Sequence, residues 1–425
     1  MKERYESYKD SGIHWIGQVP QGWDVRRIAY AYAENTKQNT TLEKTEAYQF
    51  NYGMLIKKSR KYDESVDSEV YSRYTIFLPN DIVINGLNLN YDFVSQRVAI
   101  AKTEGIITSA YVCITPRTNI HSPYFCYLFK AMDAMKLFHG MGTGIRLTLS
   151  YDELKKQPIP LPTLPEQRAI AGYLDARCAA IDAYVASLER EAGLARELKQ
   201  ALIARAVTRG LDPNAPMRDS GIPWIGQVPA GWEVVRTKAL FKSVKRIVGN
   251  DVDKYERLAL TMKGVIKRSK DDGEGLQPEK FETYQILKEN ELVFKLIDLQ
   301  NVRTSRVGIS PYIGLVSPVY IILTNDIPDN RYFYYWFMSM YHRNVFNYLG
   351  SNGVRSALNA SDLLNIKIPL PPLPEQCSIA AYLDERCRNI DEYTASLERE
   401  ASLARELKQR EIADAVTGKV RVFNQ

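Results

Sequence analysis

The chain repeats part of its own sequence at a fixed distance of 209 residues. Residues 9–27 (KDSGIHWIGQVPQGWDVRR) return as residues 218–236 with 14 of 19 positions identical, and residues 159–208 return as residues 368–417 with 37 of 50 identical. Between the copies lie segments 28–158 and 237–367, which have equal length and little identity. Solenoids repeat at about 20–50 residues, so a period this long indicates a duplicated domain pair. One frame therefore carries two different inserts.

The longer repeated segment predicts a long helix in each copy. A proline-rich lead ends at Pro165, and no proline follows it until after Gly210. Apolar residues then recur every three or four positions, with charged residues beside them. Each helix of about 43 residues would be on the order of 65 Å long. Two such helices with matching stripes are expected to pack together, with Cys178 and Cys387 in the core. One stripe position differs between the copies, because Val185 becomes Thr394.

The segment GLDPNAPMRDSG (210–221) after the first helix reads as a linker, and the second helix is expected to end near Thr417. The end of the second helix should then meet the same surroundings that the linker meets in mid-chain. This arrangement predicts a pseudo-cyclic molecule with an internal pseudo-two-fold duplication.

The two inserts are predicted to be mixed α/β domains of roughly 130 residues each. Short β-rich runs occupy 75–84, 97–101 and 105–115 in the first insert, and 290–297, 306–310 and 314–324 in the second. Each insert then has an aromatic stretch with helical character, at 123–132 and 331–341.

Composition excludes several classes of protein. At 45% hydrophobic and 25% charged residues, the chain matches a globular protein of two or three domains. It has no apolar run of membrane-spanning length and no apolar signal segment, so we expect a cytoplasmic, reduced protein. The four histidines form no metal-ligand cluster, and no catalytic motif is recognisable. The G-x-G-x-G at 140–144 does not follow a clear strand, which argues against a cofactor loop.

Candidate nucleic-acid contacts lie in the inserts. The net charge of +6 permits nucleic-acid binding without requiring it. Arg and Lys can grip phosphates or read base edges, and they recur here at related places in both inserts. They comprise two basic runs, one matched arginine pair and two Gly-x-Arg loops: Lys57, Lys58, Arg60 and Lys61; Lys267, Arg268 and Lys270; Arg97 and Arg306; Arg146 and Arg355. The alternatives are solvated basic turns, and arginines that cap groups of their own domain.

Each shorter repeated segment carries two tryptophans, Trp15 and Trp23 in the first and Trp224 and Trp232 in the second, around Val-Pro-x-Gly-Trp. They are expected to pack against the edge of their own domain. The alternative is a surface on which a partner docks.

Taken together, the D-S-G-I-x-W-I-G-Q-V-P-x-G-W segments, the P-L-P-x-L-P-E-Q leads and the S-L-E-R-E-A-x-L-A-R-E-L-K-Q stretches resemble the specificity (S) subunit of type I restriction-modification systems. The resemblance covers the whole chain. It implies two target recognition domains that each read one half of a bipartite, asymmetric DNA sequence, separated by an antiparallel coiled coil that sets the gap. The expected domain limits are 1–158 for the first recognition domain and 159–210 for the central spacer helix. The linker and the second recognition domain cover 211–367, and the C-terminal spacer helix covers 368–425.

The resemblance also implies partners and cofactors. Two adenine-methylating subunits, which use S-adenosylmethionine, would dock on the frame, and two ATP-dependent restriction subunits could join them. The chain itself would bind double-stranded DNA, need no cofactor and have no catalytic role. The expected partner surface is the repeated helices, represented by their stripe residues: Leu174, Ile181, Leu188, Leu198, Leu383, Ile390, Leu397 and Leu407.

Two other functions fit parts of the pattern. A bivalent scaffold that bridges two protein partners shares the frame but predicts no salt-sensitive affinity for duplex DNA. A piece split from a fused nuclease-methyltransferase would need catalytic motifs, which the sequence lacks.

Overall fold

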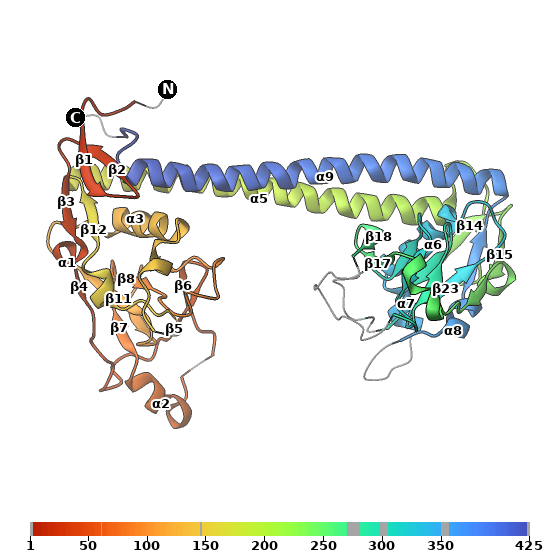
Figure 1. Ribbon diagram of the computed structural model, residues 1–425, viewed down its shortest axis with the longest axis horizontal. Coiled ribbons are helices and arrows are strands. Elements are labelled where there is room, and N and C mark those ends of the chain that lie inside the picture. Colours follow the sequence, from red (N-terminus) through yellow and green to blue (C-terminus); the bar gives the residue numbers. More distant parts are fainter. Residues whose placement is uncertain are drawn as a thin grey trace. The chain divides into compact units, whose positions relative to one another are not determined.

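The structure is a computed structural model that describes residues 3–60, 62–144, 147–269, 281–297, 299, 305–349 and 357–422. It has two compact units, and each contains a mixed α/β domain together with part of both long helices (Figure 1). Unit 1 comprises Met1–Glu189 and Arg399–Gln425, and unit 2 comprises Arg190–Glu398. Within the described residues, no helix combines the length and the apolar character needed to cross a membrane.

The two long helices begin and end where the sequence predicts. Helix α5 spans Leu164–Arg209 and helix α9 spans Leu373–Val416. Gly210 follows α5 with a φ of 71°, and Gly418 lies just beyond α9 with a φ of 73°. Glycine adopts this left-handed conformation without a steric penalty, so it ends a helix readily.

In each unit, α5 and α9 run antiparallel. In unit 1, Lys408 Nζ lies 2.6 Å from an Asp182 carboxylate oxygen, while Arg405 pairs with Glu189. Residue numbers therefore decrease along α9 in the direction in which they increase along α5. Unit 2 contains the repeat-related ion pair, in which Lys199 Nζ lies 2.6 Å from Asp391. The predicted antiparallel helix pair is confirmed.

Each domain is built on a four-stranded antiparallel sheet of the same order. In unit 1 the order is β4 (Tyr32–Glu34), β11 (Val112–Pro116), β8 (Ile82–Ile84) and β9 (Val98–Ile100). In unit 2 it is β16 (Lys242–Val244), β23 (Ile321–Thr324), β20 (Leu292–Phe294) and β21 (Val307–Ile309). The inserts thus differ in sequence but share a topology.

Further strands are arranged differently in the two domains. In unit 2, β18 (Gly264–Arg268), β17 (Arg257–Thr261), β22 (Gly314–Val316) and β19 (Gln285–Leu287) form one sheet. In unit 1 the corresponding strands form two separate pairs. These are β5 (Tyr48–Asn51) with β6 (Met54–Lys57), and β7 (Thr75–Phe77) with β10 (Gly105–Ile107).

Repeated strands form the frame that ties each domain to its helices. Strand β3 (Asp24–Arg27) pairs with β12 (Pro158–Leu161), and β15 (Glu233–Arg236) pairs with β24 (Lys367–Leu370). The Trp segments form β1 (Tyr8–Ile13) with β2 (Gly17–Pro20), and β13 (Met217–Asp219) with β14 (Gln227–Pro229).

The shorter helices are α1 (Ile28–Ala31), α2 (Glu64–Ser72), α3 (Ser122–Ala134), α4 (Tyr151–Leu154), α6 (Arg331–His342), α7 (Val345–Leu349) and α8 (Ala360–Asn365). Among the described residues, 3₁₀ turns cover Leu137–Gly140, Thr237–Ala239 and Gly249–Lys254.

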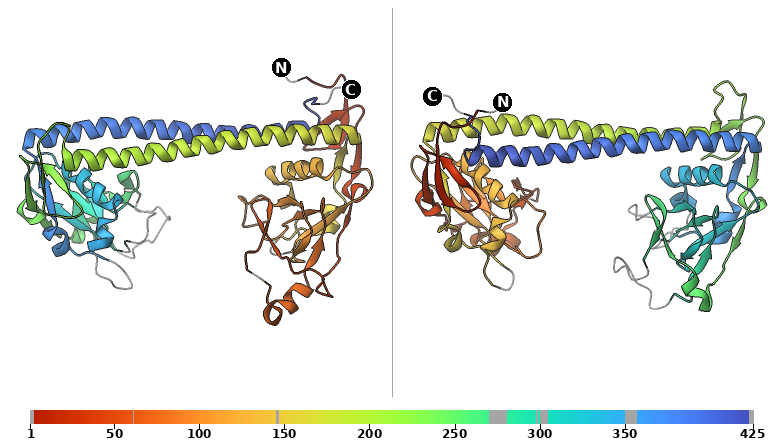
Figure 2. Two further views of the ribbon diagram at one scale, coloured as in Figure 1. Left: turned by 180° about the vertical axis from the view of Figure 1, so that it is seen from behind. Right: turned by 45° about the horizontal axis from the view of Figure 1, so that its top comes forward.

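The predicted aromatic helices α3 and α6 join the domains to the long helices. In the right-hand view of Figure 2, the aromatic helix of each unit lies beside the long helices. Tyr124 of α3 donates a hydrogen bond to the Val416 carbonyl at 2.9 Å, and Tyr332 of α6 donates to the Val207 carbonyl at 3.2 Å. Because these tyrosines are fully buried and their hydroxyls are satisfied, they fix the domain on the helix ends.

The end of each long helix meets a Trp segment, as the pseudo-cyclic arrangement predicts. Gly418 after α9 contacts Pro20 and Trp23 in unit 1. Gly210 after α5 contacts Pro229 and Trp232 in unit 2. After α5, the chain itself continues into the Trp segment of unit 2. After α9, the chain is joined to the residues before the first Trp segment by hydrogen bonds, such as the one that Arg421 N donates to the Glu3 carbonyl at 2.9 Å.

Candidate nucleic-acid and partner interfaces

The first basic run follows the β5–β6 hairpin. Lys57 Nζ lies 2.5 Å from Glu46 Oε1, and the side chains of both residues are about half exposed. Lys58 Nζ lies 5.4 Å from the centroid of the Tyr74 ring, within cation–π distance. Both lysines therefore lie at the surface, with partners of their own that an incoming phosphate would share or displace.

Arg60 ends the same run and holds α2. Its Nη2 donates to both carboxylate oxygens of Asp67, each at 2.7 Å. The backbone N–H of Asp63 and this guanidinium keep the pKa of Asp67 below its ordinary value. Arg60 remains exposed on its outer side, while Lys61 lies outside the described residues.

The second basic run occupies the corresponding hairpin in unit 2. Lys267 Nζ lies 2.5 Å from Glu256 and 5.2 Å from the ring centroid of Tyr312. Arg268, at the end of β18, is half-buried. Lys270 lies outside the described residues. The two hairpins thus place basic residues at related positions.

Sequence reasoning missed the tips of these hairpins. At the tip of β5–β6, Tyr52 and Gly53 have φ values of 43° and 76°, as a two-residue type I′ turn requires, and Tyr52 is exposed. At the tip of β17–β18, Met262 is also exposed beside Lys263. The signal available in the sequence was a large apolar residue one or two positions before a glycine, as in Tyr52-Gly53 and Met262-Lys263-Gly264.

Arg97 and Arg306 correct the predicted set of DNA contacts. Both side chains are only 1% exposed, and both point into their own domain. Nη1 of Arg97 donates to the Leu87 carbonyl at 2.7 Å, and Nη1 of Arg306 donates to the Ile297 carbonyl at 2.8 Å. A buried guanidinium that is already bonded to backbone carbonyls is not presented to a phosphate, so the geometry favours the alternative in which these arginines cap groups of their own domain.

The Gly-x-Arg loops are only partly described. Gly144 adopts a φ of 77° at the tip of a small turn closed by Thr143 and Thr148. Arg146 and Arg355 lie outside the described residues. The short helices α4 and α8 follow these loops.

The predicted partner residues on the helix stripes also require correction. Most of them are buried within the chain, so they hold the chain's own core together and are not available to a partner. Leu174 and Leu383 are fully enclosed. The other covered or largely covered residues are Ile181, Leu188, Ile390 and Leu397. Leu198 and Leu407 alone among the eight are exposed.

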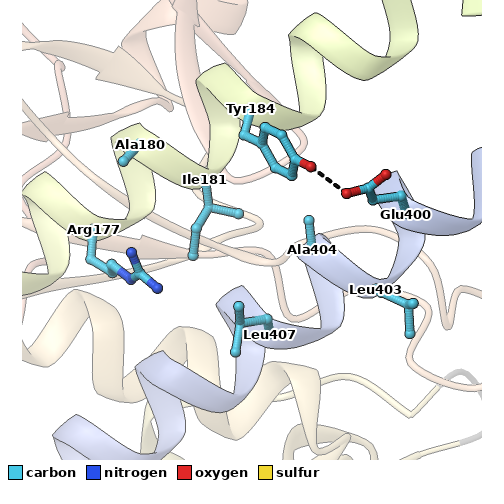
Figure 3. A pocket seen from close by; sticks show the side chains of 8 residues that line it. All are labelled: Arg177, Ala180, Ile181, Tyr184, Glu400, Leu403, Ala404 and Leu407. Atoms are coloured by element: carbon cyan, nitrogen blue, oxygen red, sulfur yellow. Dashed lines mark hydrogen bonds between the residues drawn. The ribbon is translucent and has the colours of Figure 1, made fainter. Parts of the chain in front are cut away.

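Exposed apolar residues of α5 and α9 line a groove between these two helices in unit 1. Figure 3 shows the groove, with Tyr184 and Ile181 on α5 facing Ala404 and Leu407 on α9. Tyr184 donates a hydrogen bond to Glu400 across the groove. Tyr184 is 46% and Leu403 58% exposed. The hollow of about 500 Å³ is open, shallow and mainly apolar.

Unit 2 carries the repeat-related side chains in the same pairing. Tyr393 donates a hydrogen bond to Glu191, and Leu194 and Leu198 are exposed next to them. Tyr393, Leu194 and Leu198 stand 209 residues from Tyr184, Leu403 and Leu407. Each unit therefore displays one copy of the same apolar surface.

A comparison with protein families bears on this architecture. Residues 28–183 and 229–399 match the model of the type I restriction modification DNA specificity domain. The chain belongs to this family. It is a type I specificity subunit, and its two matched regions coincide with the two recognition domains and the adjoining helices. Such subunits recognise DNA for methyltransferase and restriction subunits and are not themselves catalytic.

Two curated proteins of Methanocaldococcus jannaschii are similar to this specificity subunit over almost their whole length. The putative type I restriction enzyme MjaX specificity subunit is 23% identical, over 96% of each chain. The type I restriction enzyme MjaVIII specificity subunit is 25% identical, over 99% of this chain and 97% of its own. The fold is also found in a solved structure described as the basis of assembly and conformational transition of the type I R-M system. It is 16% identical, with a TM-score of 0.66 over 94% of this chain and 98% of the other.

The inner tryptophans of the specificity subunit pack within it. Trp23 and Trp232 are buried, and their Nε1 atoms donate to Glu166 at 3.1 Å and to Glu375 at 2.9 Å. The prediction of edge packing is confirmed for this pair. Both acceptors lie in the first turns of α5 and α9, so the frame joins each Trp segment to the start of a long helix.

Proposed function

We propose that each domain of this specificity subunit reads one half of a bipartite, asymmetric DNA target, while the helical frame docks two adenine-methyltransferase subunits. Two restriction subunits would complete the assembly. The observation that carries the proposal is a contrast within one chain. The exposed tyrosine and leucines beside the helix pair recur in both units, whereas the hairpins and loops of the two domains differ. Equal grooves suit two copies of one partner, and unequal domains suit two different half-sites.

The DNA side of the proposal rests on the hairpins and the basic runs that follow them. Lys57, Lys58 and Arg60 lie at the surface of the α/β domain of unit 1 (domain 1). Lys267 and Arg268 occupy the related place in the α/β domain of unit 2 (domain 2). We assign them to phosphate contacts, since the charge of Lys and Arg neutralises backbone phosphates without reading sequence. Lys61, Arg146, Lys270 and Arg355 remain proposed contacts on sequence grounds alone. The exposed hairpin tips at Tyr52 and Met262 are added to the set as apolar groups that can meet base edges.

The partner side rests on the grooves and replaces the buried stripe residues. Tyr184, Leu403 and Leu407 in unit 1 present apolar surface beside the Tyr184–Glu400 hydrogen bond. Tyrosine and leucine together supply apolar area with few polar groups to desolvate, as the centres of protein interfaces require. Because the same residues recur in unit 2, a partner that binds one groove has a second equivalent site.

One experiment tests the whole assignment. Methylated adenines are mapped across the host genome with and without the gene for this chain. We expect the loss of one bipartite motif that has two unequal halves and a fixed gap. Replacing residues 28–158 by the corresponding domain of a different specificity subunit should change one half of the motif. The other half and the gap should stay the same. Loss of nothing, or loss of a symmetric motif, would contradict the proposal.

Docking is tested separately by native mass spectrometry of the purified complex with methyltransferase subunits. The Leu403→Asp variant should lower the methyltransferase content from two copies to one, and a Leu403→Asp/Leu194→Asp variant should lower it to none. The hairpin variant Tyr52→Ala serves as the control and should keep both copies. Persistence of two copies in the Leu403→Asp/Leu194→Asp variant would remove the grooves from the interface.

The scaffold alternative makes a different prediction. A protein that only bridges two partners shows no steep salt dependence of duplex binding, whereas neutralisation of six to ten phosphates lowers affinity by roughly 10³–10⁵ between 50 and 200 mM salt. A flat salt response of the assembled complex would favour the scaffold.

A further inference from the structure

The loop between β8 and β9 in domain 1 is the most exposed apolar feature of that domain. It covers residues 85–96 and contains no helix or strand. Tyr91 is 77% and Val94 84% exposed, and Phe93 is exposed between them. A loop of this length that shows large apolar groups to solvent is usually functional, because neither its packing nor its backbone bonding explains them.

The same loop is held from beneath by the buried Arg97. Its Nη1 donates to the carbonyls of Asn85 at 3.0 Å and Leu87 at 2.7 Å, and its Nη2 donates to the carbonyl of Asp92 at 2.7 Å. Nη2 also lies 3.6 Å from an Asp92 carboxylate oxygen. One guanidinium therefore replaces the strand pairing that the loop lacks, and it joins the first half of the loop to the second. Neither lysine nor any neutral side chain offers the same fork of donors.

Further contacts fix the part of the loop that carries the exposed groups. The Asp92 carboxylate accepts from the Ser95 N–H at 2.9 Å and from the Val94 N–H at 3.1 Å, and these bonds keep the pKa of Asp92 below its ordinary value. The ring of His139 stacks on Phe93 with centroids 4.7 Å apart. The backbone of the loop is thus preorganised while Tyr91 and Val94 remain free of packing.

The loop also borders a hollow of about 780 Å³ that contains basic residues of the neighbouring helices. Residues 93–96 form one wall, and α3, α5 and α9 form the others. The cationic residues of these walls are Lys130, Lys136, Arg405 and Lys408. The carboxylates are Asp133, Asp175 and Asp182, of which Asp182 pairs with Lys408 and Asp175 accepts from the Tyr127 hydroxyl. Cations next to an apolar loop fit duplex DNA, whose phosphates flank base edges that include the thymine methyl group.

Domain 2 keeps the arginine and changes the loop. Arg306 stands 209 residues after Arg97, is equally buried, and donates to the Ile297 carbonyl at 2.8 Å and the Lys295 carbonyl at 3.4 Å. The loop sequences in front of the two arginines share almost nothing. A constant anchor under a variable loop is the arrangement expected where the loop, and not the anchor, carries the specificity.

We propose that residues 87–96 form a base-reading element of domain 1, and that Arg97 is the positioning residue that sets its conformation without touching DNA. The inference rests on the proposed function, because it takes domain 1 to read one half-site. It assigns the discrimination between bases to Tyr91 and Val94, and phosphate contact to the cations of the adjoining hollow.

The test is selection of bound duplexes from a library with two randomised blocks, using the full chain assembled with its methyltransferase subunits. Wild-type complex should enrich two half-sites. Arg97→Met should lower the base preference at one half-site about tenfold and leave the other half-site unchanged. Arg97→Lys should restore only part of that preference. Arg306→Met is the matched control and should affect the opposite half-site.

A surface variant keeps the proposal testable if Arg97→Met fails to fold. Tyr91→Ala/Val94→Ala leaves every Arg97 hydrogen bond in place, so its thermal unfolding should match wild type while its preference at the same half-site falls. Equal loss of affinity for all duplexes, or an unchanged preference in this variant, would overturn the assignment of the loop. Failure of the wild-type complex to select any bipartite motif would instead overturn the proposed function.

Discussion

The two repeats differ at one buried ion pair between the long helices, which makes a direct prediction about stability. In unit 1, Glu411 of α9 is only 4% exposed and accepts from Nε and Nη2 of Arg177 at 2.9 and 3.2 Å, and from the Tyr173 hydroxyl at 3.4 Å. The position related to Glu411 by the repeat is Leu202. The arginine at the related position, Arg386, therefore has no carboxylate there.

The magnitude follows from the burial of the two partners. Removal of one partner of a fully buried pair costs about 3–5 kcal/mol, because the other charge remains without compensation. The Arg177 side chain is 45% exposed, so water reaches the pair and reduces that cost. We expect Arg177→Met to destabilise unit 1 by about 2 kcal/mol. In a unit of roughly 200 residues this lowers the melting temperature by about 4–8 °C.

The assay is differential scanning calorimetry together with urea unfolding, with Arg386→Met as the matched control in unit 2. The control removes an exposed arginine of the same helical frame and should cost less than about 0.5 kcal/mol. The double variant Arg177→Met/Glu411→Leu imitates the second repeat at Leu202 and should recover most of the loss, since both charges are gone. Equal effects of Arg177→Met and Arg386→Met, or no recovery in the double variant, would refute the reasoning.

Two further predictions concern the helix ends and acid stability. Gly418→Ala should destabilise by roughly 3 kcal/mol and Gly210→Ala by roughly 1 kcal/mol. Both have positive φ, but an added Cβ meets the rigid Pro20 ring at 2.4 Å (Cδ) in the first. In the second it meets the end of the Glu375 side chain at 2.8 Å and Trp232 Cζ2 at 3.3 Å. Urea midpoints of the two variants check this order, and equal midpoints would contradict it. In unit 2, a hydrogen bond from Arg331 keeps the pKa of Asp329 below its ordinary value. The contribution of the ionised Asp329 carboxylate to folding stability is therefore complete above about pH 4, and it is lost as the pH falls through the lowered pKa. Urea midpoints between pH 5 and 2 should fall less steeply in Arg331→Met than in wild type.

Much of the frame was predictable because it depends on local rules. The proline lead and the glycines after each helix set the limits of α5 and α9 to within a residue or two of the prediction. Short β-rich runs and aromatic stretches gave some of the strands, including β8 and β20, and the helices α3 and α6, but not the β5–β6 and β17–β18 hairpins. The 209-residue repeat required each unit to be built in the same way. In all of these, the information lies within a few residues of the position that it determines.

The site residues were predicted less well, because the periodicity of a helix shows which side chains share a face and not what covers that face. Leu174 and Leu407 lie on the same kind of stripe, yet the first is buried against its domain and the second is exposed in the groove. The basic runs were found at the surface because lysine is costly to bury without a partner. The groove leucines Leu194 and Leu403 were missed since they lie off the stripe.

The sequence by itself determined the duplication, the two long helices, the mixed α/β class of the domains and their membership of a DNA specificity family, since these depend on pattern and spacing. Only the tertiary structure decided the direction in which matched residues point. Arg97 and Arg306 are of the residue type that commonly contacts phosphates, but the path of the chain surrounds each guanidinium with carbonyl groups. A buried charge must find its hydrogen-bond partners inside the protein, and those partners come from backbone positions that no local pattern specifies.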